Sequence, residues 1–160
     1  MLDGDSLRET LVDCGVTHIV WIPDGSTGAW DAALSSPRAP TLIRVCREGE
    51  AFAVAAGLLL GGKKPVIIMQ CTGLFEAGDS LRSFIHDLQL PIFALVGLRN
   101  FYAYGKGQSR DSAPRFAASI VRAWQVPFVI FEKSSAGEDL ASIYTRAMKE
   151  KKPQVVFLAE

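Results

Sequence analysis

The stretch TLIRVCREGEAFAVAAG, residues 41–57, decides how this chain folds. Residues 41–45 are rich in β-branched side chains and predict a strand, whereas residues 48–60 are small or apolar and predict a helix. A strand that leads into a helix is the building unit of open α/β sheets, which bind their ligands where the strands end. At this point the sequence presents a carboxylate, Glu48, with apolar sequence on both sides.

The composition describes an ordinary globular domain. A length of 160 residues suits one compact domain, 1–160, with a normal core. The 17 basic and 17 acidic residues balance, which gives no electrostatic case for binding nucleic acid or an anionic membrane surface. The longest apolar run, residues 51–60, has about half the length needed to span a bilayer. We therefore expect no membrane partner.

The three cysteines, Cys14, Cys46 and Cys71, are an odd number and form no CxxC pair. This pattern argues for a reducing compartment and against a disulfide framework or a zinc site. The residues after Met1 do not form a secretory signal. We therefore predict a cytoplasmic protein, and we expect no metal ligands within this chain.

Strand and helix patterns alternate along the whole chain. The predicted strands are residues 17–22, 41–45, 66–70, 91–97, 126–131 and 155–158. The predicted helices are one capped within residues 3–6 and stopped at Gly15, one from Ser26 or Thr27 to Leu34, 48–60, one from Asp79 or Ser80 to Leu88, 113–124, and one from Ser134 or Ser135 to Lys149. Residues 71–78 and 98–112 are predicted as loops. Six βα alternations without a repeat or linker predict an α/β three-layer sandwich with a six-stranded parallel sheet.

Functional residues of such a sheet are expected in the loops that follow the strands. Four loops stand out: residues 23–27, 46–50, 70–73 and 99–110. The common phosphate-binding signatures GxGxxG and GxxxxGK[ST] are absent from the sequence. The site must therefore be identified from other motifs.

Several short blocks in these loops resemble one family. They are IPDGS (22–26), REGEA (47–51), AAG (55–57), GKKP (62–65), MQCTGL (69–74), LP (90–91) and LVGLR (95–99). In order and spacing, over nearly the whole chain, they resemble the pyrimidine-binding (Pyr) domain of thiamine diphosphate enzymes. The resemblance is to the sulfopyruvate decarboxylase alpha subunit and to phosphonopyruvate decarboxylase in particular, and it implies a Pyr-domain fold.

The resemblance implies a role for Glu48, which stands nine residues before Gly57, where the family places its cofactor-activating glutamate. In these enzymes that carboxyl hydrogen-bonds ring nitrogen N1′ of the aminopyrimidine. A carboxyl in an apolar pocket has its charged form disfavoured, so it can share a proton with a heterocycle. The residues implied to frame the cofactor are Gln70, Cys71, Thr72 and Gly73, with Pro23 and Gly25. Glu50 is interpreted as a simple helix-start acid.

The chain also departs from the family. Relatives usually carry a run similar to Asn-Ser-Gly-Leu-Gly-Asn, where this chain has Cys71-Thr-Gly-Leu-Phe-Glu76, and this leaves the substrate open. The GDG…NN motif, which binds Mg²⁺ and the diphosphate in a separate PP domain, is absent from the sequence. The resemblance therefore implies a hetero-oligomer in which a beta-type partner subunit carries the PP domain and the Mg²⁺.

The predicted function is that of a carboxy-lyase subunit acting on a small anionic 2-oxo acid, such as sulfopyruvate or phosphonopyruvate. Candidate substrate-binding residues are Asp24 and Ser26 in the turn after the first strand, and Arg99 and Arg110, whose guanidinium groups suit carboxylates, sulfonates and phosphonates. Asp24 and Ser26 are equally suited to a plain turn, and the arginines to a solvated loop. His86 is the remaining candidate for acid–base chemistry. Two alternatives stay open: half of another thiamine diphosphate carboligase or lyase, or an inactive Pyr-like scaffold.

Overall fold

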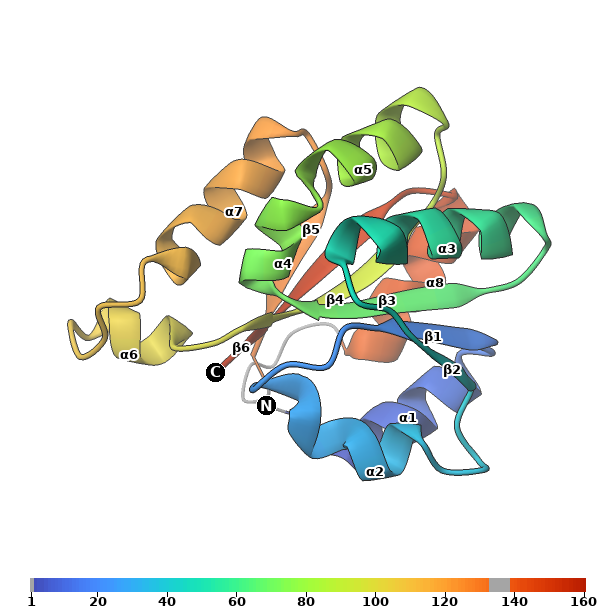
Figure 1. The fold of residues 1–160 in the computed structure, drawn as a ribbon, viewed down its shortest axis with the longest axis horizontal. Helices are drawn as coiled ribbons and strands as arrows, with labels where there is room; N and C mark the ends of the chain where they lie inside the picture. The colour runs from blue at the N-terminus through green and yellow to red at the C-terminus, as the bar shows by residue number, and fades with distance from the viewer. Residues whose placement is uncertain (1, 133–138) are drawn as a thin grey trace.

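A computed structural model describes residues 2–132 and 139–160 of the chain. Its centre is a six-stranded sheet with the order β2-β1-β3-β4-β6-β5, in which every neighbouring pair is parallel (Figure 1). The strands are β1 His18–Trp21, β2 Thr41–Arg44, β3 Pro65–Gln70, β4 Phe93–Leu98, β5 Phe128–Phe131 and β6 Gln154–Ala159. The predicted six-stranded parallel sheet is confirmed.

Helices connect the strands and cover both faces of the sheet. They are α1 Gly4–Asp13, the 3₁₀ turn η1 Thr27–Trp30, α2 Asp31–Leu34, α3 Glu48–Leu60, α4 Cys71–Glu76, α5 Gly78–Arg82, the π-helical turn η2 Ser83–Asp87, α6 Phe101–Gly105, α7 Ala113–Ala123 and α8 Leu140–Glu150. Helices α3, α4, α5 and α7 lie on one side of the sheet, and α1, α2 and α8 lie on the other (Figure 1). The three-layer architecture is therefore confirmed.

The strands are buried on both faces, as a parallel sheet between two helix layers requires. In β3, Ile67 and Met69 pack into the core under α3, α4 and α7, whereas Val66 and Ile68 pack into the core over α1, α2 and α8. All four side chains are fully buried. This explains why the sequence of β3 shows a continuous apolar run instead of alternation.

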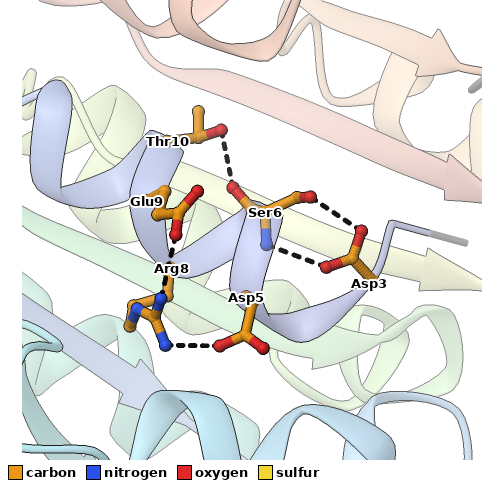
Figure 2. A network of polar contacts seen from close by, with 6 residues as sticks. All are labelled: Asp3, Asp5, Ser6, Arg8, Glu9 and Thr10. Carbon is orange, nitrogen blue, oxygen red and sulfur yellow. Dashed lines mark hydrogen bonds and ion pairs between the residues drawn. The ribbon is translucent and has the colours of Figure 1, made fainter.

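The helix starts agree in part with the sequence. Asp3 caps α1 as expected, because its carboxylate accepts a hydrogen bond from the Ser6 amide (Figure 2). The N-cap of α8 is Asp139, which accepts from the Ser142 amide. The predicted caps of that helix, Ser134 and Ser135, lie outside the described residues.

The prediction of a loop over residues 71–78 was wrong, because α4 begins directly after β3. Buried Cys71, Leu74 and Ala77 recur every three residues, so one helical face packs on the core. The next helix, α5, begins at Gly78, so Asp79 and Ser80 lie inside it instead of capping it.

Further boundaries differ from the predictions, and β4, predicted over 91–97, begins at Phe93. The expected loop 98–112 contains the short helix α6, and the strand predicted over 126–131 begins at Phe128. Among the described residues, no helix is long and apolar enough to cross a membrane.

Because all six strands are parallel, their carboxyl ends share one edge of the sheet, which we call the carboxyl edge.

Candidate functional site

Glu48 is the first residue of α3, which follows β2, so it lies at the carboxyl edge. Its side chain is half-buried against Gly73, the third residue of α4. A Cβ atom added to Gly73 would lie 2.7 Å from Cδ of Glu48, so the carboxyl group occupies space that any larger residue would fill. Two residues that the sequence named separately, Glu48 and Gly73, are thus brought together by helices that follow different strands.

The Glu48 carboxylate accepts no hydrogen bond from any of the described residues. Its position at the amino end of a 13-residue helix favours a negative charge, because the helix dipole is positive there. The neighbouring acid, Glu50, behaves differently: Oε2 of Glu50 accepts from the Cys46 amide at 3.2 Å. Glu50 is therefore a helix-start acid, as predicted, and Glu48 has a carboxylate available for a ligand.

A third acid, Glu76 at the end of α4, completes this junction. Its Oε1 pairs with Nη2 of Arg47 at 2.7 Å, and its Oε2 accepts from the Gly49 amide at 3.1 Å. These bonds hold the pKa of the Glu76 carboxyl below its usual value, with the Arg47 hydrogen bond as the larger cause. The sequence identified Glu76 only as a departure from the family pattern.

The residues at the start of α4 differ in how far they are exposed to solvent. Gln70 ends β3 in an extended conformation, Thr72 is exposed, and Cys71 is buried. Burial raises the pKa of the Cys71 thiol to about 11, and the negative charge of Asp111 adds to this. Cys71 is therefore a thiol at neutral pH and has no activated thiolate for nucleophilic chemistry.

The turn after β1 is organised by Asp24. Its carboxylate accepts from the Ser26 amide at 2.6 Å, the Thr27 amide at 3.0 Å and the Thr27 hydroxyl at 2.8 Å. The prediction that Ser26 or Thr27 caps the following helix was wrong, because neither side chain caps η1 and Asp24 binds both amides. Pro23 and Gly25 are exposed in the same turn. The geometry gives Asp24 the turn role that the sequence left open.

Ser26 differs from Asp24, because its side chain is buried and its Oγ has no hydrogen-bond partner in the part of the chain that the structure describes. It faces Gly97 in β4: a Cβ added to Gly97 would lie 3.7 Å from Cβ of Ser26 and 3.6 Å from Oε1 of Glu160. Oε1 of Glu160 is likewise buried without a partner among residues 2–132 and 139–160. Two buried oxygens without partners in the described chain thus lie beside Gly97 at the carboxyl edge.

The Glu160 carboxyl was not anticipated from the sequence, because it follows β6 and no local motif links it to β1 or β4. Burial raises the pKa of this carboxyl, Asp24 raises it further, and Arg99 lowers it. Arg99 also approaches the β1 turn, since its Nη1 would lie 3.9 Å from a Cβ on Gly25. The structure thus gathers Ser26, Arg99 and Glu160 at the carboxyl edge.

Two other candidates lie apart from this group. Arg110 is exposed and forms no ion pair or side-chain hydrogen bond among the described residues. Nε2 of His86 lies 2.6 Å from the Trp124 carbonyl, which indicates a structural role for this imidazole between η2 and the end of α7. Over residues 2–132 and 139–160, no three His, Cys, Asp or Glu side chains cluster as metal ligands would.

Sequence comparison relates the chain to two kinds of decarboxylase. It is 33% identical over 91 residues to phosphonopyruvate decarboxylase of Streptomyces hygroscopicus, a match that covers 57% of this chain and 23% of that protein. It is 25% identical over 96 residues to the sulfopyruvate decarboxylase subunit alpha of Methanococcus maripaludis, covering 60% and 58%. The subunit alpha of Methanothermobacter thermautotrophicus is 26% identical over 128 residues, covering 78% and 75%. No protein-family profile matches the chain.

Solved structures agree with these matches at the level of the fold. Benzoylformate decarboxylase from Polynucleobacter necessarius aligns with a TM-score of 0.73 and 17% identity, over 99% of this chain and 30% of that one. A thiamine diphosphate-dependent enzyme isolated from Mycobacterium smegmatis aligns with a TM-score of 0.69 and 18% identity, over the same shares. The predicted resemblance and the Pyr-type fold are confirmed, while the matches span a quarter to just over half of the first relatives' lengths.

Proposed function

We propose that this chain is the Pyr-domain part of a thiamine diphosphate-dependent 2-oxo acid decarboxylase. The observation that carries the proposal is the half-buried Glu48 carboxylate, which lies against the bare backbone of Gly73 at the amino end of α3. The names of the similar proteins, phosphonopyruvate and sulfopyruvate decarboxylase, support the reaction class.

The residues at this junction fit the aminopyrimidine half of that cofactor. A flat heterocycle needs a hydrogen-bonding carboxyl at one edge, and Glu48 offers it, with Gly73 leaving room for the Glu48 side chain. Gln70 and Thr72 lie close to Gly73 in the chain, and the turn of Pro23 and Gly25 follows the neighbouring strand β1. When bound, thiamine diphosphate supplies the electron sink for the loss of CO₂ from a 2-oxo acid.

The contribution of the chain is to orient the ring and to hold a proton. Protonated on one carboxyl oxygen, Glu48 donates a hydrogen bond to the ring nitrogen; ionised, it accepts one from the protonated ring. The half-buried position of the side chain at the amino end of α3 places its carboxyl oxygens where a ring can reach them.

The substrate is proposed to bind at the second group on the carboxyl edge, formed by Ser26, Arg99 and Glu160. Arg99 is an exposed cation whose nearest acid, Asp111, lies 4.0 Å away, so it can bind a sulfonate, phosphonate or carboxylate. Ser26 and Glu160 have buried oxygens without partners in the described chain, which can hydrogen-bond a polar substrate. A small anionic 3-substituted pyruvate matches the positive charge of Arg99 and the hydroxyl group of Ser26.

The remaining half of the site is proposed to come from a partner. Relatives named as subunit alpha imply another subunit, which we propose carries a PP domain with the Mg²⁺ and the diphosphate in a hetero-oligomer. The cysteines of the chain, Cys14, Cys46 and Cys71, are all free thiols in the structure, which supports the proposed cytoplasmic location.

The test is to co-express the chain with a PP-domain chain of the same genome and to measure aldehyde release. Sulfopyruvate, phosphonopyruvate and pyruvate are compared, each with and without thiamine diphosphate and Mg²⁺. We expect turnover only from the loaded pair, and we expect Glu48→Gln to lower kcat by about 10²- to 10⁴-fold, the usual contribution of a positioned acid–base group.

Glu50→Gln is the matched control, because it removes a carboxylate two residues away whose hydrogen bond goes to the Cys46 amide. This variant should keep turnover within about twofold, as expected for a group outside the reacting atoms. Size-exclusion chromatography checks that both variants still assemble. Full activity of the Glu48→Gln pair would refute the role of Glu48, and assembly without turnover by the unsubstituted pair would favour an inactive scaffold.

A further inference from the structure

We propose that Glu76 is the positioning residue that holds Glu48 over Gly73. The inference rests on the proposed function, and it assigns a role to the acid at which this chain departs from the family run. Glu76 touches neither the reacting carboxyl nor the ring surface. It acts through the residues on both sides of Glu48.

The amino end of α3 has no local side-chain cap. Arg47 occupies the N-cap position with an extended backbone (φ −138°, ψ 144°), and its side chain makes no capping bond. Glu76 supplies the missing cap from another helix, because its Oε2 accepts from the Gly49 amide at 3.1 Å. Its other oxygen binds Nη2 of Arg47 at 2.7 Å. One carboxylate thus fixes the residue before and the residue after Glu48.

The spacing within α4 makes this arrangement possible. Gly73 and Glu76 are three residues apart and therefore lie on the same face of their helix. That face meets the first turn of α3, where Gly73 leaves room for the Glu48 side chain and Glu76 binds the backbone beside it. Ser80 adds to the contact, since a Cβ on Gly49 would lie 2.9 Å from its Oγ.

The ion pair itself adds little to global stability. The Arg47 side chain is 78% exposed and that of Glu76 is 37% exposed, and such pairs are screened by water. The effect of Glu76 on reaction rate can be larger than its effect on stability, because a displacement of about 1 Å at a reacting group can cost roughly 10²-fold in rate. The effect of Glu76 is therefore expected in kcat and only weakly in thermal stability.

The first test measures the position of Glu48 directly, without turnover. In the full chain, a nuclear Overhauser effect is expected between the side-chain methylene protons of Glu48 and the Hα protons of Gly73. Glu76→Ala should abolish it, whereas Glu76→Gln should keep it, because the amide oxygen still accepts from Gly49. Asp79→Ala is the matched control, since it removes an exposed acid that pairs with Arg82 three residues along α5.

The second test measures the kinetics of the same variants in the pair loaded with thiamine diphosphate and Mg²⁺. Glu76→Ala should lower kcat by roughly 10- to 100-fold with KM for the 2-oxo acid nearly unchanged, and Glu76→Gln should restore it. Asp79→Ala should match the unsubstituted pair. If Glu76 only stabilises the fold, Glu76→Ala should lower the melting temperature without lowering kcat at constant KM.

The two measurements separate the two proposals. Persistence of the Overhauser effect in Glu76→Ala overturns the positioning role, and so does its loss with unchanged kcat. If the unsubstituted pair shows no turnover with any 2-oxo acid, the proposed function fails. The Overhauser effect then still decides whether Glu76 holds Glu48 over Gly73.

Discussion

The first turns of α1 and α3 differ in which side chain hydrogen-bonds their free backbone amides. At α1 the capping bonds are local: Asp3 accepts from the Ser6 amide at 2.9 Å and from its hydroxyl at 2.7 Å, and Arg8 pairs with Asp5 and Glu9 (Figure 2). At α3 the cap comes from Glu76, which follows the next strand of the chain.

The difference bears on which of these helix starts has a carboxylate available for a ligand. The first-turn acid of α1, Asp5, is paired with a neighbouring arginine, so its charge is already compensated. The first-turn acid of α3, Glu48, accepts no hydrogen bond from the described residues, because the capping is done by Glu76. A local cap stabilises a helix, whereas a remote cap leaves the first-turn carboxylate available and fixes its place relative to a second helix.

Among the substitutions that test this difference between α1 and α3, the largest effect on kcat is expected from Gly73→Ala. The added methyl group would lie 2.7 Å from Cδ of Glu48 and must displace the carboxyl group. We expect kcat of the assembled enzyme to fall by about 10²-fold, as for other misplaced reacting groups. Gly57→Ala is the control, because a methyl group there meets open space. If both variants retain full turnover, the contact between Glu48 and Gly73 has no part in the reaction.

An intermediate effect, on stability alone, is expected from Asp3→Ala. Loss of an N-cap side chain typically costs about 1 kcal/mol, which corresponds to a fall in melting temperature of roughly 2–4 °C for a chain of this size. Turnover at a temperature well below the transition should not change. Differential scanning calorimetry and a kinetic assay check the two halves of this prediction, and a parallel fall in kcat would show that the α1 start also supports the site.

The smallest effect is a dependence of stability on pH. The pKa of Glu76 is lowered in the folded state by Arg47 and by the Gly49 amide. Its ionised form therefore stabilises the fold above the unfolded pKa, and this contribution is lost as the pH falls through the folded pKa. Urea unfolding of wild type and Glu76→Gln should differ at pH 7 and converge below the ordinary glutamate pKa, near 4.3. A difference that is constant with pH would contradict this interpretation.

Much of the fold could be predicted because its signals are local. Continuous apolar runs such as the one in β3 indicate strands buried on both faces, and the α3 boundaries 48–60 agree with the structure. The α4 helix was missed because Thr72 and Gly73 are poor helix formers, which concealed the spacing of the buried Cys71, Leu74 and Ala77. Burial of that face outweighs the weak local propensity.

The site was predicted in part for the same reason. Glu48 and Gly73 lie in short motifs that resemble a family, so both could be named from the sequence. Glu160 and the cap formed by Glu76 depend on contacts between residues far apart in the chain, such as those over Gly97, and no local pattern encodes them. The sequence could not tell whether Asp24 or Ser26 organises its turn, because either side chain can bind nearby amides.

The remote cap also has a consequence for the time at which the site forms. A chain emerging from the ribosome can form the capping bonds of α1 once residue 10 is free, because the bonds between Asp3 and Ser6 and between Thr10 and Ser6 lie within residues 3–10. The α3 start must wait until Glu76 has been synthesised and α4 has packed beside it. Contacts between distant residues form late, since they must first close a long loop. Glu48 thus reaches its position over Gly73 only after α4 has packed against α3.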